Sequence, residues 1–119
     1  MHRILAAAIG LSALALASQA LAHAHLTSSD PAAKAKVAAP RRITLHFSET
    51  LNPRFSGVEL TMPQMANMAE PAKVAVSEDK LSMVVTPNAP LPAGAHKVSW
   101  HAVTTDSHRT HGDFIFTVR

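Results

Sequence analysis

The strongest constraint on the fold of this chain is an alternation of apolar and polar residues with a period of two. It is clearest in residues 43–47, 98–102 and 114–118, where every second side chain is apolar. Because successive side chains of a β-strand point to opposite faces of a sheet, this pattern predicts strands with one buried face. Seven such strands are predicted, at residues 24–28, 43–47, 58–62, 74–76, 81–85, 98–102 and 114–118.

Turn-forming residues separate the predicted strands. Asp30-Pro31, Asn52-Pro53 and the stretch from Pro87 to Gly94 are typical turn signals. Short antiparallel strands with such turns predict an all-β fold, either a β-sandwich or a small Greek-key β-barrel. Only residues 32–37 also fit a short amphipathic helix. We expect one domain, with Trp100, the only tryptophan of the chain, at the centre of its core.

The first 22 residues have the features of a secretory signal peptide. Arg3 gives a positively charged start, residues 4–16 form an apolar run, and Ala20 and Ala22 are the small residues that a signal peptidase reads. The run is too short for a transmembrane helix, and a buried helix is the alternative interpretation. Cleavage after Ala22 would leave a mature domain of residues 23–119. A cut after Ala24 is also compatible with the sequence.

The composition narrows the chemistry that such an exported domain can carry. The formal net charge of +3 is too small and too scattered to indicate a nucleic-acid-binding protein. The chain has no cysteine, so neither disulfides nor thiolate ligands are available. It has eight histidines and five methionines, which leaves imidazoles, thioethers, carboxylates and the new N-terminus as candidate metal ligands.

The predicted cleavage would create an N-terminal histidine at position 23. Its free amine and its imidazole Nδ1 could bind one metal ion together, an arrangement called a histidine brace. Such a nitrogen pair favours Cu(II), which prefers a tetragonal field of nitrogen and oxygen ligands. His25 offers a competing mode, because a histidine in third place can bind Cu(II) with the amine and two deprotonated amides. The plain alternative is that His23 merely follows the processing site.

A second candidate group is Asp106 and His108, between the last two predicted strands. In an extended backbone, residues two apart point the same way, so this carboxylate and this imidazole could face one ion. Asp106 could equally be an ordinary turn residue. His108 and His111 have a spacing found in zinc sites, but Gly112 indicates a loop there rather than a helix.

The third group is Met62, Met65 and Met68, which are spaced by three in the segment "TMPQMANMAEP". Pro63 argues against a helix, so the spacing is not a buried helical stripe. Thioethers are soft ligands that select Cu(I). The alternative is that the methionines only fill gaps at the end of the domain, which is the stronger interpretation for Met62.

Four segments together resemble the CopC family of periplasmic copper-binding proteins. They are "HAHLTSSDPA", "ITLHFSETL", "FSGVELTM" and "LPAGAHKVSWHAVTTDSHRTHGDFIFTV". The resemblance spans the whole expected mature chain. It implies a seven-stranded, immunoglobulin-like Greek-key β-barrel in the periplasm that sequesters or carries copper and catalyses no reaction.

The resemblance also assigns ligands. It implies a Cu(II) site at His23, Asp106 and His108, with Glu49 near the site as a marginal ligand. For Cu(I) it implies Met62, Met65 and Met68, but two later positions of that site, a histidine and a methionine, are Glu70 and Lys73 here. The missing histidine predicts weaker Cu(I) binding, or the use of His46 or His96 instead.

Three functions are therefore compared. The first is a monomeric copper carrier or buffer in copper resistance and homeostasis. The second is a copper-dependent oxidative enzyme, which would use the same brace; the absence of tyrosine and the single tryptophan argue against an aromatic substrate platform. The third is a binding module that docks on an inner-membrane copper transporter, which is compatible with the first.

Overall fold

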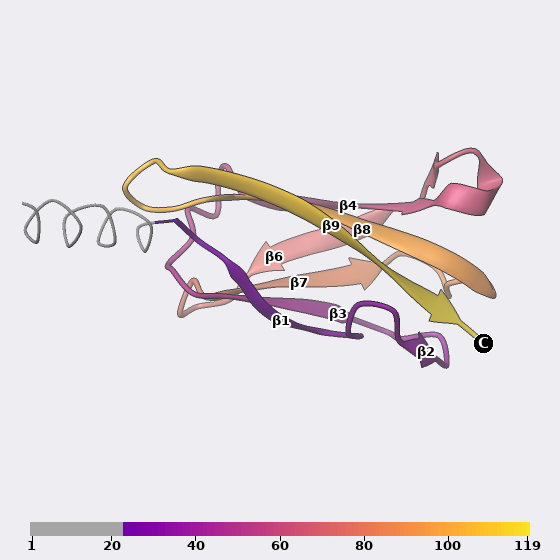
Figure 1. Ribbon diagram of the computed structural model, residues 1–119. Helices are drawn as coiled ribbons and strands as arrows, with labels where there is room; N and C mark the ends of the chain where they lie inside the picture. Colours follow the sequence, from indigo (N-terminus) through magenta and orange to yellow (C-terminus); the bar gives the residue numbers. More distant parts are fainter. Residues whose placement is uncertain (1–22) are drawn as a thin grey trace, which may run out of the picture.

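The structure is a computed structural model that describes residues 23–119 (Figure 1). The expected signal peptide, residues 1–22, lies outside the described residues. The described part contains nine β-strands and one 3-10 turn, and no helix long and apolar enough to span a membrane. The elements are β1 (Leu26–Asp30), β2 (Lys36–Val37), β3 (Ile43–Phe47), β4 (Gly57–Met62), η1 (Pro63–Met65), β5 (Met68–Ala69), β6 (Ala72–Val76), β7 (Ser82–Pro87), β8 (Gly94–Val103) and β9 (Arg109–Val118).

The strands form two sheets that face each other as a sandwich (Figure 1). One sheet has four strands in the order β1-β3-β7-β6, and the other has five in the order β2-β9-β8-β4-β5. All pairs are antiparallel except β2 with β9. The all-β prediction is confirmed, and of the two predicted forms the strands adopt the two-sheet sandwich rather than one continuous barrel sheet.

Every predicted strand is present; β3 has the predicted ends, and the others differ at one or both ends. β8 and β9 are ten residues each, longer than predicted, because they pair along their whole length, from Gly94 with Val118 to Val103 with Arg109. The short strands β2 and β5 were not predicted. The helix considered for residues 32–37 is wrong: Lys34 has φ 68°, which ends any helix there, and β2 pairs with β9.

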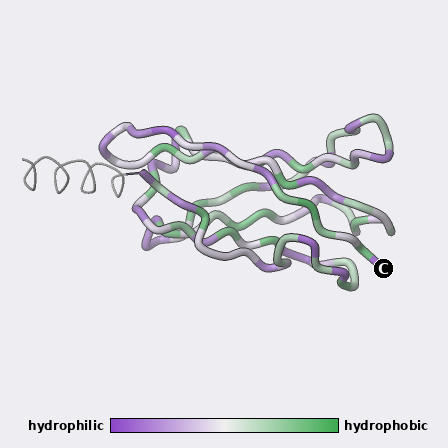
Figure 2. Tube along the Cα trace, viewed as in Figure 1, coloured by the Kyte–Doolittle hydropathy of each residue, from purple (hydrophilic) through white to green (hydrophobic). Residues whose placement is uncertain are grey.

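The core lies between the sheets and is built from the inward half of each alternating strand. Figure 2 shows hydrophobic positions recurring along the strands, whereas the turn between β8 and β9 is largely hydrophilic. The largest fully buried side chains are Phe116, Ile43, Leu45, Leu51, Met83, His96, Val85 and Val98. His96 is the one polar residue of this set.

Trp100 points inward as predicted but is not the centre of the core. It is only partly buried, and its ring meets the ring of Phe47 edge-on at a centroid distance of 5.2 Å. The ring also covers Gly112, where an added Cβ would lie 2.6 Å from Cζ2. The tryptophan therefore closes one side of the core, and Gly112 is a glycine because the indole occupies the space of a side chain.

β8 runs the length of the domain and connects its two ends. It begins beside the β4–η1–β5 hairpin and ends at the turn to β9, which lies at the same end of the sandwich as residue 23 (Figure 1). Ten residues of strand span about 30 Å. The predicted Cu(II) ligands and the methionine segment therefore lie at opposite ends of the molecule.

Candidate metal centre

The segment that follows residue 22 is held firmly against the sandwich. Ala24 is 1% exposed, and its carbonyl accepts a hydrogen bond of 3.0 Å from the hydroxyl of Thr110. The N–H of His25 donates to Ser48 Oγ at 2.9 Å, and the N–H of Ser48 donates to the His25 carbonyl at 3.0 Å. These bonds direct His23 toward the turn between β8 and β9.

That turn is organised by Thr104, which is almost fully buried. Its hydroxyl accepts a 3.1 Å hydrogen bond from the N–H of His108 and donates to Oδ1 of Asp106. Its own N–H donates to the carbonyl of His108 at 2.9 Å. Ser107, with φ 74°, lets the backbone reverse between the two candidate ligands. The extended backbone predicted for residues 106–108 is thus wrong, because the segment is a tight turn.

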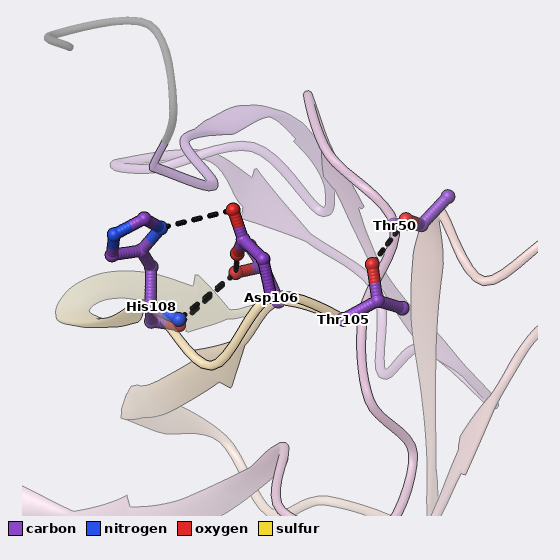
Figure 3. Close-up of polar contacts among 5 residues, drawn as sticks. Thr50, Thr105, Asp106 and His108 are labelled. Atoms are coloured by element: carbon purple, nitrogen blue, oxygen red, sulfur yellow. Dashed lines mark hydrogen bonds and ion pairs between the residues drawn. The ribbon is translucent and has the colours of Figure 1, made fainter.

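The turn nevertheless brings the two predicted ligands together. Oδ2 of Asp106 lies 3.1 Å from Nδ1 of His108, as Figure 3 shows. The Thr104 hydroxyl bond, and then the nearby imidazole of His108, lower the pKa of the Asp106 carboxyl below its ordinary value. Asp106 is therefore ionised at neutral pH and orients the ring of His108.

His23 completes the cluster from the other side. Its ring lies edge-on to the ring of His108, with a centroid distance of 4.7 Å and an interplanar angle of 61°. Its Nδ1 atom is buried and has no hydrogen-bond partner among the described residues. A buried polar atom without a partner is energetically unfavourable, and a metal ion bound there would satisfy it. The donor set of two imidazoles and one carboxylate therefore suits a Cu(II) ion.

Among residues 23–119, no three histidine, aspartate or glutamate side chains already surround a common point. Two further features of the cluster bear on how a metal ion could bind there. Both oxygens of Asp106 are engaged by Thr104 and His108. The nitrogen of His23 is in a peptide bond with Ala22 in this chain, so the amine ligand of a brace would exist only after cleavage.

The remaining histidines and the carboxylate considered at this end of the domain are exposed. Glu49 is exposed in the connection after β3, and its carboxylate makes no hydrogen bond or ion pair with another described residue. His25 is exposed, and its amide is one of the two that the competing peptide mode would deprotonate. His111 is exposed on β9, and the ring of His101 lies over Gly57 of β4.

The three methionines occupy different positions in the hairpin at the opposite end. Met62 is 6% exposed and pairs with Met68 across the β4–β5 ladder, whereas Met65 in η1 and Met68 are 55% and 52% exposed. Met62 and Met68 line a groove of about 360 Å³. The other side of this groove is the segment 87–92. The thioethers of Met62 and Met68 thus share a concave, mostly apolar surface.

Of the two histidines considered as substitute Cu(I) ligands, His96 is bonded through both ring nitrogens, and His46 lies on the four-stranded sheet, away from β4 and β5. His96 is fully buried, with Nδ1 at 2.5 Å from Glu70 Oε1 and Nε2 at 2.8 Å from the Pro92 carbonyl oxygen. His46 lies in the four-stranded sheet, with Nδ1 at 2.9 Å from Ser82 Oγ. Continued backwards from Val98, the period-two pattern would place His96 on the inward face of β8, which was the available signal for its burial.

Comparison with known proteins places this chain in a family. The model of the CopC domain matches residues 26–119. The chain belongs to the CopC family. It is 46% identical over 112 residues to copper resistance protein C of Escherichia coli, with 89% of each chain covered. It is 41% identical over 123 residues to copper resistance protein C of Xanthomonas campestris pv. juglandis, covering 98% of this chain and 97% of the relative.

A solved structure confirms the fold of this CopC-family chain. The crystal structure of PcoC, a methionine-rich copper resistance protein from Escherichia coli, matches with a TM-score of 0.76 and 48% identity. The match covers 82% of this chain and 100% of PcoC. The family recognised from the sequence segments is therefore confirmed, and with it the two-sheet fold of this domain.

Proposed function

We propose that this CopC-family protein binds Cu(II) through His23, Asp106 and His108 and that it sequesters or carries copper in copper resistance and homeostasis. The observation that carries the proposal is the buried, unpartnered Nδ1 of His23 beside the ring of His108. The relatives support the choice of metal, since they are named as copper resistance proteins.

The proposal includes the processing of the chain. Residues 1–22 act as a signal peptide that directs the protein to the periplasm, and residues 23–119 form the mature copper-binding domain. Cleavage after Ala22 gives His23 a free amine beside its Nδ1, so that one residue supplies two ligands. The buried Ala24 fixes the direction of this terminus, which lowers the entropy lost when copper binds.

The proposed roles of the other two residues follow from their hydrogen bonds. If Nδ1–H of His108 donates to Asp106, the lone pair of His108 Nε2 is the one available to copper. Asp106 then orients the imidazole and contributes a negative charge to the site. Copper displaces protons from the amine and the imidazoles, so the affinity for Cu(II) should fall as the pH decreases.

The test is a Cu(II) titration of the mature protein and of His108→Phe. The proposal predicts a large loss of affinity in His108→Phe, because the variant keeps the aromatic ring but loses the ligand nitrogen. His111→Phe is the matched control, since it removes a histidine of the same strand region outside the cluster. Unchanged affinity in His108→Phe would reject the assignment of this residue.

A second proposal concerns Cu(I). Met62 and Met68 lie opposite each other on a groove, and Met65 is exposed nearby, which supports a thioether site for a soft ion. Because His96 and Glu70 are bound to each other, we propose a site of thioethers without a histidine, and hence a weak one. Replacing Met62 and Met68 together by leucine should abolish Cu(I) binding in a competition with bicinchoninate.

The two alternative functions have separate tests. An oxidative enzyme would show ascorbate-driven turnover of a substrate that is lost in His23→Ala. The partly buried Trp100 and the absence of tyrosine argue against a broad aromatic platform for such a substrate. Docking on an inner-membrane copper transporter would appear as copper-dependent binding to that transporter. We expect the free protein to be a monomer, which light scattering would establish.

A further inference from the structure

We propose that His96 and Glu70 are positioning residues that set the distance between the two walls of the methionine groove. The biological meaning of this link rests on the proposed Cu(I) function, whereas the hydrogen bonds of His96 do not depend on it. One wall of the groove is the hairpin side, residues 62 and 68–71, and the other is the segment 87–92. The link between the walls passes through the buried imidazole of His96.

The link is a chain of two short hydrogen bonds. His96 Nδ1 meets Glu70 Oε1 of the hairpin wall at 2.5 Å, and His96 Nε2 meets the carbonyl oxygen of Pro92 in the opposite wall at 2.8 Å. The imidazole also stacks on Phe116 of the core, with a centroid distance of 5.5 Å and an interplanar angle of 22°. The ring is therefore fixed in three directions.

The protons of the link follow from the chemistry of its acceptors. The carbonyl of Pro92 can only accept a hydrogen bond, so Nε2 of His96 carries a hydrogen atom. One further proton lies between Nδ1 and the carboxyl group of Glu70. Such a buried, fully bonded pair is costly to break, because removal of one member leaves the other unsatisfied away from water.

A second contact supports the same geometry. The N–H of Asn88 donates to the carbonyl of Pro71 at 2.9 Å, which joins the two walls at another point. The N–H of Glu70 donates to the Leu60 carbonyl at 2.8 Å, so the hairpin itself cannot slide along β4. The His96 link is the contact that reaches from the core strand β8 to both walls.

The spacing of the walls matters because methionine side chains are flexible. A thioether carries three rotatable bonds and has no fixed direction of its own. The backbone that carries Met62 and Met68 must therefore supply the geometry of any soft-metal site, within about 0.5 Å. If the link is lost, the walls stay joined at Asn88, but the segment 89–92 is no longer held at a fixed distance from the side chains of Met62 and Met68, and their flexible thioethers lose the surface that limits their directions.

Glu70→Ala and Glu70→Gln separate a positioning role from a loss of charge. Glutamine keeps the shape and can donate a hydrogen bond to Nδ1 of a neutral His96, so Glu70→Gln preserves the link. Glu70→Ala removes it. We expect Glu70→Ala to lose about 10-fold in Cu(I) affinity, as is typical when a group behind a metal ligand is removed, and Glu70→Gln to stay close to the wild type.

Val98→Ala is the matched control for a purely structural effect. Val98 is the next inward residue of β8 and is fully buried, but it does not line the groove. The variant Val98→Ala should lower the melting temperature of the protein and leave its Cu(I) affinity unchanged. Cu(II) affinity at the far end should be the same in all these variants.

A measurement on the metal-free protein tests the link independently of copper. The methyl NMR signals of Met62 and Met68 should shift in Glu70→Ala, whereas the signal of the core residue Met83 should not. Unmoved methionine signals, or an equal loss of Cu(I) affinity in Val98→Ala, would overturn the proposal. If the wild type binds no Cu(I), the proposed Cu(I) function fails, and the methyl signals still decide whether the link positions the methionines.

Discussion

The role of Thr104 gives the sharpest test of how the proposed Cu(II) site is held. Thr104→Val keeps the shape of this buried side chain but removes the hydroxyl that binds both Asp106 and the backbone of His108. The variant therefore leaves all proposed ligands in place and removes only their common support. Its effect on copper binding measures how much the arrangement of the turn contributes.

The expected magnitude follows from the hydrogen bonds that are lost. The 3.1 Å bond from the N–H of His108 contributes about 0.5–1.5 kcal/mol to folding. The hydroxyl bond to Asp106 is lost with it, so urea unfolding of Thr104→Val is measured alongside copper binding. The affinity for Cu(II) should fall as well. Removing a group that orients a metal ligand typically lowers affinity by about 10- to 100-fold.

Thr105→Val is the matched control. Thr105 is the next residue of the same turn, and its exposed hydroxyl lies 3.4 Å from the hydroxyl of Thr50, away from the cluster (Figure 3). Affinities are measured by competition with a fluorescent Cu(II) chelator at constant pH. The reasoning is refuted if Thr104→Val binds Cu(II) as tightly as the wild type, or if Thr105→Val loses as much affinity.

Three further predictions concern the fold. Gly112→Ala should lower the free energy of unfolding by about 1–3 kcal/mol and change the near-UV circular dichroism, because the Cβ of the alanine would lie 2.6 Å from the ring of Trp100. An unchanged spectrum would contradict this packing. Leu45→Ala empties a fully buried site and should cost about 2–5 kcal/mol by urea unfolding; a cost below 1 kcal/mol would place Leu45 outside the core. Hydrogen bonds from the hydroxyl of Ser77 and from a backbone N–H lower the pKa of Asp79 below its ordinary value of 3.8. The ionised carboxylate therefore stabilises the folded state at pH values above 3.8. This contribution disappears as the pH falls through the lower pKa of the folded state. Asp79→Asn should therefore reduce the urea midpoint at pH 6 and have little effect at pH 2; equal effects at both pH values would show that the charge is not responsible.

The strands could be predicted because burial of one face of a strand gives an alternation of apolar and polar residues in the sequence. The inward set of β8 includes Val98, Trp100 and Ala102, and the alternation identified all three. The same alternation says nothing about how deeply each residue lies in the core. Trp100 is partly exposed because its large ring reaches across Gly112 toward the side of the sandwich, and that depends on the register of β8 and β9.

The cluster at the N-terminal end depends on contacts between residues far apart in the chain. His23 and His108 meet because Thr110 binds the carbonyl of Ala24, a contact that no local pattern reveals. The family resemblance named the ligands, but it did not indicate Thr104, whose hydroxyl closes the turn around them. The pairing of His96 with Glu70 was missed for the same reason, since Glu70 follows β5 and lies 26 residues before His96 of β8.

The central claim is that the amine of His23 is a copper ligand. The most direct measurement compares Cu(II) affinity and the EPR spectrum of the chain that begins at His23 with the same chain acetylated at its N-terminal amine. We predict that acetylation lowers the affinity by about 100-fold or more, since one arm of the chelate is lost, and that His25→Ala leaves both observables unchanged. Equal affinity and identical spectra with and without the acetyl group would contradict the proposed histidine brace.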